Sequence, residues 1–571
     1  MKLVDNIKGK NIPKLDFNIQ HDSMELFDLT LRNWLIIITA IIALSFLLFM
    51  VFRSKKIVYK GLAATIYILL TVSSALILQN WSYTLLYLSL PSLILSLVLY
   101  AWTYRKPADP VWDIEFVTSQ GKKVVRGIQR GVAIFGAAGS GKTVLIHTLF
   151  MRHFAKAGFA GIIYDYKDGE LTELALPLFG DRLEVIALHH PEKSIRVNPI
   201  HPDYIHGEKD VNQLVKVILD NLIHTGSAKG DDFFKDSASS LLSGVMLKFW
   251  FDHKEYCTLP HIISFILAVD FSIQTEQHDR FGDDATEQFA KLKAFLTSNV
   301  RVAVQGSTFL LGLGSAKQTA SVISTLANAL RKVAFPEAFY VLSGNDIDFN
   351  INAEKVDIVV SVINEPKSAE FLSPINATII HTITKQMMSR GRKPSFVLLD
   401  EAPTIKLLNM AQIPATMRSF GVSVIYCAQD IVQGVVQYGR DGFREIIANL
   451  STQFFGKAND SETAKFYESY FELVKEQTRS TTKKGSDGNL FSWGEKSTTV
   501  GEREVAKHRA HEFTRLKVGQ FAFLSDGNNQ IVNITASKAE SHSLRTQNRI
   551  SARILDENYN RILREAKSVL E

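Results

Sequence analysis

The chain has 571 residues, 46% of them hydrophobic, and a formal net charge of +6 at neutral pH. A chain of this length can form two or three domains, and its mild basic excess suits a nucleic acid or an anionic membrane without choosing between them. Its only cysteines, Cys257 and Cys427, lie far apart in the sequence, which excludes a disulfide framework and a thiolate zinc site.

Three long apolar segments follow one another near the N-terminus, at 34–52, 57–78 and 83–102. Each approaches or matches the roughly 20 residues that a helix needs to cross a bilayer. Tryptophans stand at segment ends, where an interfacial belt places them. We therefore predict a membrane anchor over residues 1–106 with about three transmembrane helices; buried soluble helices are the alternative.

The flanking charges predict the orientation of this anchor. Arg53 and two lysines follow the first segment, and Arg105 and Lys106 follow the third. Because cytoplasmic loops are enriched in Lys and Arg, the chain beyond position 106 is expected in the cytoplasm. The same rule puts the N-terminus outside although it carries four lysines of its own. The number of spans and the N-terminal orientation therefore stay open.

Beyond the anchor, short apolar runs alternate with amphipathic stretches, a pattern typical of an α/β domain with a mostly parallel sheet. The expected strands are 132–135, 161–164, 183–188, 356–362, 396–399, 422–427, 453–455 and 521–524.

Helical periodicity replaces this alternation in the middle of the chain. We predict an all-helical domain at 201–318, inserted between two parts of the sheet domain at 107–200 and 319–540. The Ser-, Thr-, Lys- and Gly-rich stretch 477–502 predicts a mobile loop or a long hairpin. An amphipathic helix is expected at 541–571, packed on its own domain or turned toward a partner, DNA or the membrane surface.

A phosphate-binding pattern follows the first strand of the sheet domain. The segment GAAGSGKT fits G-x-x-x-x-G-K-[ST] between an apolar strand and an amphipathic helix. The residues expected to surround the phosphates of ATP are Gly136, Ala137, Ala138, Gly139, Ser140, Gly141, Lys142 and Thr143. In such a loop Lys142 reaches the β- and γ-phosphates and the Thr143 hydroxyl binds Mg²⁺. A chance Gly-rich turn is the alternative.

The segment FVLLDEAP ends a later strand in two carboxylates. On a strand neighbouring the phosphate loop, Asp400 would bind Mg²⁺ through water and Glu401 would polarise the attacking water. Alone, such a run often marks only a helix N-terminus, but a pure binding switch would need no Glu401. The pair therefore predicts ATP hydrolysis.

Two further residues fit the same reaction. Gln429 closes the strand VSVIYCAQD and would sense the γ-phosphate or the attacking water. Arg418 precedes that strand and is either an arginine finger for a neighbouring subunit's nucleotide or part of a surface salt bridge.

These elements, in this order, resemble the TraD/TraG-type coupling proteins of type IV secretion and conjugation, within the wider FtsK/HerA group. The other segments that carry the likeness are Tyr164–Leu171 (YDYKDGEL), Val197–Ile200, Asp231–Leu247, Thr319–Phe335 and Ala448–Phe471. The first departs from the family's Asp-Pro-Lys-Gly-Glu pattern, since Tyr166 replaces the proline and Asp168 is additional. The family usually has two membrane spans rather than three.

The resemblance implies a RecA-like P-loop ATPase with Mg²⁺, multi-pass in the bacterial inner membrane and assembled as a homo-hexamer. Its hydrolysis of ATP would drive single-stranded DNA with an attached relaxase toward the secretion channel. The likeness also puts Arg418 and Gln429 where the family has its finger and its sensor. A receptor for protein effectors only and a nucleotide-gated recruitment scaffold are alternatives. Candidates for DNA contact in the helical insertion are Lys248, Lys291, Lys293 and Arg301; solvated helix faces are the alternative.

Overall fold

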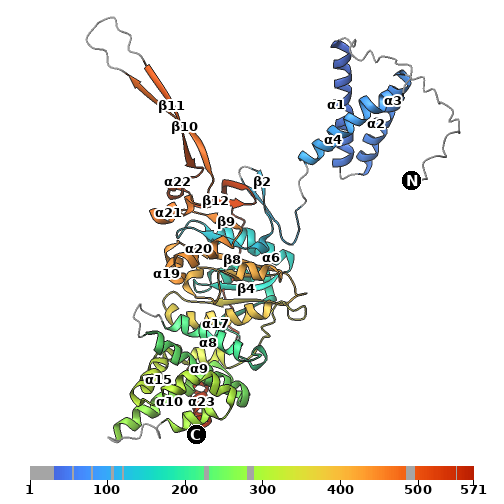
Figure 1. Cartoon of the computed structure of the whole chain (residues 1–571). Coiled ribbons are helices and arrows are strands. Elements are labelled where there is room, and N and C mark those ends of the chain that lie inside the picture. The colour runs from blue at the N-terminus through green and yellow to red at the C-terminus, as the bar shows by residue number, and fades with distance from the viewer. Residues whose placement is uncertain are drawn as a thin grey trace, which may run out of the picture. The chain divides into compact units, whose positions relative to one another are not determined.

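The computed structural model describes residues 31–54, 57–78, 81–103, 108–118, 121–223, 231–279, 289–483, 496–547 and 549–570. The chain forms two compact units, Met1–Pro107 and Ala108–Glu571. The first is helical, and the second contains a central sheet and a separate layer of helices (Figure 1).

The helices of the first unit are α1 (Leu31–Arg53), α2 (Ile57–Leu78), α3 (Trp81–Thr84), the π-helical turn η1 (Leu85–Ser89) and α4 (Leu90–Thr103). Helix α1 packs against both α2 and α4. Three stretches are long and apolar enough to cross a membrane: Ile36–Arg53, Ile57–Ile77 and Leu85–Trp102. No more than 17% of any of them is buried within the protein. Apolar helices with so much exposed surface suit lipid as a solvent, in agreement with the three predicted spans.

A nine-stranded sheet organises the second unit, in the order β13-β12-β9-β3-β8-β7-β4-β6-β5. Its strands are β3 (Val132–Phe135), β4 (Ala160–Asp165), β5 (Leu183–Ala187), β6 (Val359–Ile363), β7 (Ser395–Leu399), β8 (Val422–Ala428), β9 (Thr452–Phe455), β12 (Gln520–Ser525) and β13 (Asn528–Asn533). The seven strands from β9 to β5 are parallel, and β12 and β13 add an antiparallel edge. All eight expected strands are present; β13 was not predicted.

Both faces of this sheet are covered, which explains why its strands are apolar runs rather than alternating ones. Ala133 and Phe135 of β3 enter one hydrophobic core, whereas Val132 and Ile134 enter the other. The helices of the sheet domain are α5 (Lys142–Leu145), the π-helical η3 (Ile146–Met151), α6 (Arg152–Ala157), α7 (Glu170–Phe179), α17 (Ala369–Met387), α18 (Ile413–Arg418), α19 (Val432–Tyr438), α20 (Arg440–Ala448), α21 (Ser461–Glu468) and α22 (Ala510–Arg515). Short 3-10 turns are η2 (Ile128–Arg130), η4 (Gly180–Arg182), η5 (Pro191–Lys193), η6 (Pro202–Tyr204), η7 (Lys254–Tyr256) and η8 (Ala402–Thr404).

The helical layer lies between β5 and β6 in the chain. It comprises α8 (Glu208–Leu222), α9 (Asp231–Asp252), α10 (Leu259–Asp279), α12 (Ala290–Thr297), α13 (Val300–Gln305), α14 (Ser307–Gly312), α15 (Ala316–Arg331) and α16 (Pro336–Leu342). Helix α8 joins it to the sheet domain by packing on α17. Helix α15 packs against α9 and α10, so the helical layer continues past position 318.

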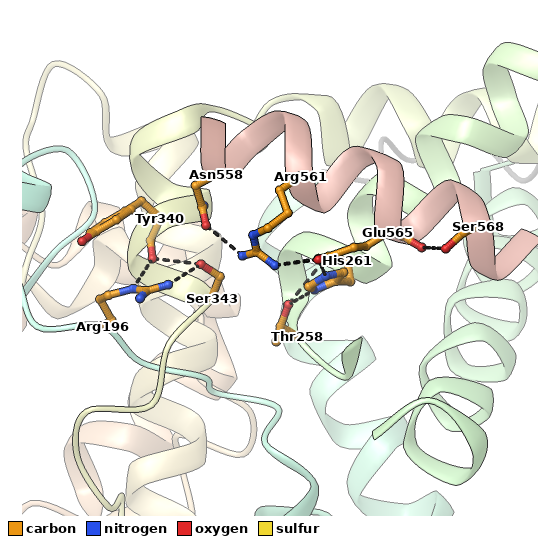
Figure 2. A network of polar contacts seen from close by, with 9 residues as sticks. All are labelled: Arg196, Thr258, His261, Tyr340, Ser343, Asn558, Arg561, Glu565 and Ser568. Carbon is orange, nitrogen blue, oxygen red and sulfur yellow. Dashed lines mark hydrogen bonds and ion pairs between the residues drawn. The ribbon is translucent and has the colours of Figure 1, made fainter. Parts of the chain in front are cut away.

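The C-terminal helix α23 (Ala552–Leu570) packs against α10 and α16 of this helical layer. Ile562 and Ala566 are buried in the contact. Figure 2 shows the polar part, in which Glu565 accepts from the His261 ring (Oε2–Nε2 3.0 Å) and pairs with Arg561. Of the roles expected for this helix, the structure shows packing within its own chain, on the inserted helices rather than on the sheet.

Two antiparallel pairs complete the unit. The strands β1 (Ile114–Thr118) and β2 (Gly121–Val125) pair near the start of the unit. Strands β10 (Leu473–Lys483) and β11 (Lys496–Ala506) form a long two-stranded hairpin that projects from the sheet domain (Figure 1). Of the two structures expected for residues 477–502, a loop or a hairpin, the described part is a hairpin.

Candidate nucleotide-binding site

Three strand ends bring the predicted site residues to one edge of the sheet. The phosphate loop follows β3, Gln429 follows β8 and Asp400 follows β7. Strand β8 lies between β3 and β7, so the two carboxylates are one strand further from the loop than the expected neighbouring strand. Because all three strands are parallel, their carboxyl ends still lie at the same edge of the sheet.

The phosphate loop has the backbone that its glycines predict. Gly139 and Gly141 adopt φ angles of 73° and 99°, which residues with a Cβ rarely adopt. A Cβ on Gly136 would lie 2.6 Å from the Ser140 hydroxyl, and one on Gly141 would lie 3.0 Å from the Gly519 nitrogen. The Gly519 amide also donates to the Ser140 carbonyl (2.9 Å), so the turn before β12 supports the loop from outside.

The loop ends in a lysine that is unusually buried for its type. Lys142 is 6% exposed and donates to the Gly136 carbonyl. Burial lowers the pKa of Lys142, while the charges of Glu401 and Asp400 raise it. The Ser140 hydroxyl is buried without a hydrogen-bond partner in the described part of the chain. A cradle with a buried cation and an unsatisfied hydroxyl fits a bound phosphate.

Glu401 interacts electrostatically with Lys142 and adopts a strained backbone conformation. It is 1% exposed and adopts a φ of 52°, which is uncommon for a residue other than glycine. Its Oε1 accepts from the Gln429 amide (2.9 Å), whereas its Oε2 is buried with no partner among the described residues. Burial raises the pKa of Glu401, and the charge of Lys142 opposes this rise. Strain and an unpaired carboxylate oxygen together indicate a functional role.

Asp400 lies beside it at the end of β7. Its backbone amide donates to the Tyr164 carbonyl (3.0 Å), which fixes the strand end. Burial raises the pKa of Asp400 to about 7, against the opposing charge of Lys167. A carboxylate so desolvated is suited to a cation, and Asp400 with Thr143 offers the oxygen ligands that Mg²⁺ prefers.

Lys167 and Glu170 also belong to this site, and the sequence did not predict them as site residues. Both lie in the segment YDYKDGEL, which contributed only to the family resemblance. The charge of Lys167, after β4, acts on both Asp400 and Glu401. Glu170 begins α7, accepts from the Thr143 hydroxyl (3.2 Å) and pairs with Lys167 (3.5 Å). Asp165 anchors the turn by accepting from the Thr172 amide (2.8 Å). A lysine two residues after an apolar strand was the available signal.

Arg418 is not brought to the site of its own chain. It is exposed at the end of α18, just before β8 begins at Val422, whereas Gln429 follows the other end of that strand. A strand of seven residues spans roughly 20 Å, so Arg418 lies near the opposite edge of the sheet.

Comparison with known proteins gives the family. The family model described as type IV secretory system conjugative DNA transfer matches residues 103–500. No curated protein matches the sequence. Among solved structures, the unbound bacterial conjugative coupling protein TrwBdeltaN70 is similar at 14% identity and a TM-score of 0.57, covering 78% of this chain and 92% of that one.

Two further structures are of the plasmid coupling protein TrwB. Its complex with a non-hydrolysable ATP analogue matches at 13% identity and a TM-score of 0.53, over 78% of this chain and 98% of that one. Its complex with ADP and Mg²⁺ matches at 13% identity and a TM-score of 0.54, over 78% and 93%. At this identity the structures show the shared fold, and the family model covers more than half of the sequence. The chain therefore belongs to the type IV secretory system conjugative DNA transfer family.

Proposed function

We propose that this protein is a membrane-anchored ATPase that uses hydrolysis of Mg²⁺-bound ATP to move single-stranded DNA, with its attached relaxase, into a type IV secretion channel. The ATPase rests on one observation: the buried Lys142 interacts electrostatically with the buried Glu401, whose Oε2 has no partner among the described residues. The family match supports DNA transfer as the process. The complexes of TrwB with an ATP analogue and with ADP and Mg²⁺ support the nucleotide and the ion.

The site residues have distinct tasks in this proposal. Lys142 and the loop amides would hold the β- and γ-phosphates, and Thr143 and Asp400 would hold Mg²⁺, which would neutralise charge on the phosphate oxygens. Glu401 would orient the attacking water through Oε2, while the Gln429 amide holds Oε1. Burial raises the pKa of Glu401 and so makes it a better proton acceptor. The Gln429 side chain would sense the γ-phosphate.

The exposed Arg418, near the far edge of the sheet, supports a ring assembly. A residue that cannot reach its own site can complete the site of a neighbour, which suits the proposed homo-hexamer. The apolar N-terminal helices would anchor this ring in the bacterial inner membrane with the sheet domain in the cytoplasm.

Two of the basic residues considered for DNA contact are already engaged within the chain. Lys248 is paired with Asp252, and Arg301 is paired with Glu208. These charges stabilise contacts within the helical layer, which makes them poor candidates for a phosphate-binding surface.

Lys167 is expected to strengthen binding of Mg²⁺-bound ATP. Changing Lys167 to Ala removes a positive charge that lowers the pKa of Asp400, so a larger share of this carboxyl would be protonated and unable to bind Mg²⁺. We expect affinity for a fluorescent Mg²⁺–ATP analogue to fall by up to about tenfold, the change that one pKa unit represents, measured by titration of the full chain in detergent. The exposed Lys355 provides the matched control. Equal affinity for the analogue in Lys167→Ala and Lys355→Ala would show that Lys167 does not contribute to nucleotide binding.

The proposed function is tested by ATP hydrolysis of the full chain, reconstituted in lipid vesicles, with and without single-stranded DNA. We expect DNA to accelerate hydrolysis and Lys142→Ala to abolish it. Hydrolysis that DNA leaves unchanged in an assembled ring would favour a receptor for protein cargo. Absence of hydrolysis in the unmodified protein would favour a nucleotide-gated scaffold. Crosslinking of transferred DNA to this protein during conjugation separates the DNA motor from the protein-cargo receptor.

A further inference from the structure

A cluster of side chains whose types can bind metals lies outside the residues assigned to the nucleotide. Asp168, His189 and His190 each offer one ligand atom, and these atoms lie within 4.8 Å of one another. Oδ1 of Asp168 is 2.9 Å from Nε2 of His189 and 3.9 Å from Nε2 of His190. Asp168 comes from the turn between β4 and α7, and both histidines follow β5.

A backbone hydrogen bond fixes the turn that carries Asp168 against the end of strand β6. Strand β6 lies between β4 and β5, and the Asp168 amide donates to the carbonyl of Asn364, just after β6 (3.0 Å). Asp168 adopts a φ of 52°, a conformation that costs free energy for a residue with a Cβ. This is the residue that is additional to the resembled family's pattern in YDYKDGEL.

A fourth residue orients one imidazole. Oε1 of Glu192 lies 3.2 Å from Nδ1 of His190, which leaves Nε2 of His190 on the side of Asp168. The Gln547 amide donates to the Glu192 carbonyl (2.8 Å) and so fixes this turn from the C-terminal segment. Histidines that bind metals usually donate their other ring nitrogen to a carboxylate in this way.

We propose that Asp168, His189 and His190 bind one divalent transition-metal ion, with Zn²⁺ or Co²⁺ as suitable probes, and that Glu192 positions His190. Bonds of about 2.0–2.2 Å place two ligands of one tetrahedral ion roughly 3.3–3.6 Å apart. The observed separations of 2.9 Å and 3.9 Å lie on either side of this range, so small shifts of the side chains would accommodate an ion. Two imidazoles and a carboxylate suit Zn²⁺, Co²⁺, Ni²⁺ or Fe²⁺ better than Mg²⁺. The side chains of Asp168 and His190 are 49% and 36% exposed, so an ion can enter from solvent and keep water as a further ligand.

This site is distinct from the proposed Mg²⁺ site, yet the same turn links them. Asp168 directly follows Lys167, whose charge acts on Asp400, and Glu170 contacts Thr143. An ion on Asp168 would therefore hold the turn that carries Lys167. The competing explanation is a hydrogen-bonded His–Asp pair that needs no ion.

The test uses the full chain in detergent, purified without a histidine tag and freed of nucleotide and Mg²⁺. After equilibrium dialysis against Co²⁺, we expect the unmodified chain to bind one ion more than His190→Gln or Asp168→Asn, and to show the visible absorption of imidazole-bound Co²⁺. Glu192→Gln should lower the affinity for this ion by about 10- to 100-fold. Asp400→Asn, which alters the proposed Mg²⁺ site, should keep the ion, and failure of ATP hydrolysis would leave this result unaffected.

His201→Gln is the matched control, because Nδ1 of His201 lies 3.5 Å from Asp203 in a His–carboxylate pair outside the proposed site. It should bind Co²⁺ like the unmodified chain. Folding is checked by melting without metal, and Zn²⁺ should raise the melting temperature of the unmodified chain but not of His190→Gln. If His190→Gln does not fold, the Co²⁺ spectrum of the unmodified chain decides. Equal binding by the variants, or absence of the imidazole bands, would leave a hydrogen-bonded pair only and overturn the proposal.

Discussion

Replacing Glu401 with Gln is expected to lower ATP hydrolysis by about two to four orders of magnitude, the usual contribution of a general base. Nucleotide binding should persist, because Lys142 and the phosphate loop are unchanged. A glutamine oxygen can still accept from the Gln429 amide, so the strained turn should keep its shape. What is lost is the carboxylate oxygen Oε2, which is buried without a partner among the described residues.

The measurement compares steady-state phosphate release with equilibrium binding of an ATP analogue for the full chain. Glu354→Gln, an exposed glutamate before β6, is the matched control and should hydrolyse ATP normally. If Glu401→Gln turned over at the unmodified rate, another group would activate the water. If it lost nucleotide binding as well, Glu401 would be supporting the fold of the site rather than the reaction.

Replacing Arg418 with Ala is expected to have an effect of comparable or larger size, about 10³- to 10⁵-fold where an arginine finger operates. The physical reason is charge: a guanidinium stabilises the negative charge that develops on the transferred phosphoryl group. Because Arg418 lies near the opposite edge of the sheet from its own phosphate loop, this loss should occur at the neighbour's site.

Mixed assemblies test that arrangement. Lys142→Ala and Arg418→Ala should each be inactive alone, whereas mixed rings should recover part of the activity, since an Arg418→Ala subunit keeps its loop and receives Arg418 from a Lys142→Ala neighbour. The control is Arg390→Ala, an exposed arginine that precedes β7 near the same edge of the sheet. Unimpaired hydrolysis by Arg418→Ala would show that Arg418 takes no part in the reaction. Inactive mixed rings would argue against a role of Arg418 at the site of a neighbouring subunit.

Local patterns were sufficient for much of this molecule. The three apolar segments and the eight predicted strands could be predicted from runs of neighbouring residues. Membrane-spanning helices and strands buried on both faces both require consecutive apolar side chains. The Gly136–Thr143 loop was readable because its glycines and its lysine have fixed spacing. In contrast, β13 and the β1–β2 pair lie in short, partly polar segments whose strand structure depends on their partners.

The sequence by itself determined the three apolar helices long enough to span a membrane, the α/β class, and Lys142, Asp400 and Glu401 as candidate site residues. Only the tertiary structure decided that β8 separates β3 from β7, and that β4 beside β7 brings Lys167 to the two carboxylates. It also decided that α23 packs on the helical layer. The reason is that sheet order and helix docking depend on contacts between residues far apart in the chain. The spacing of neighbouring residues does not predict such contacts.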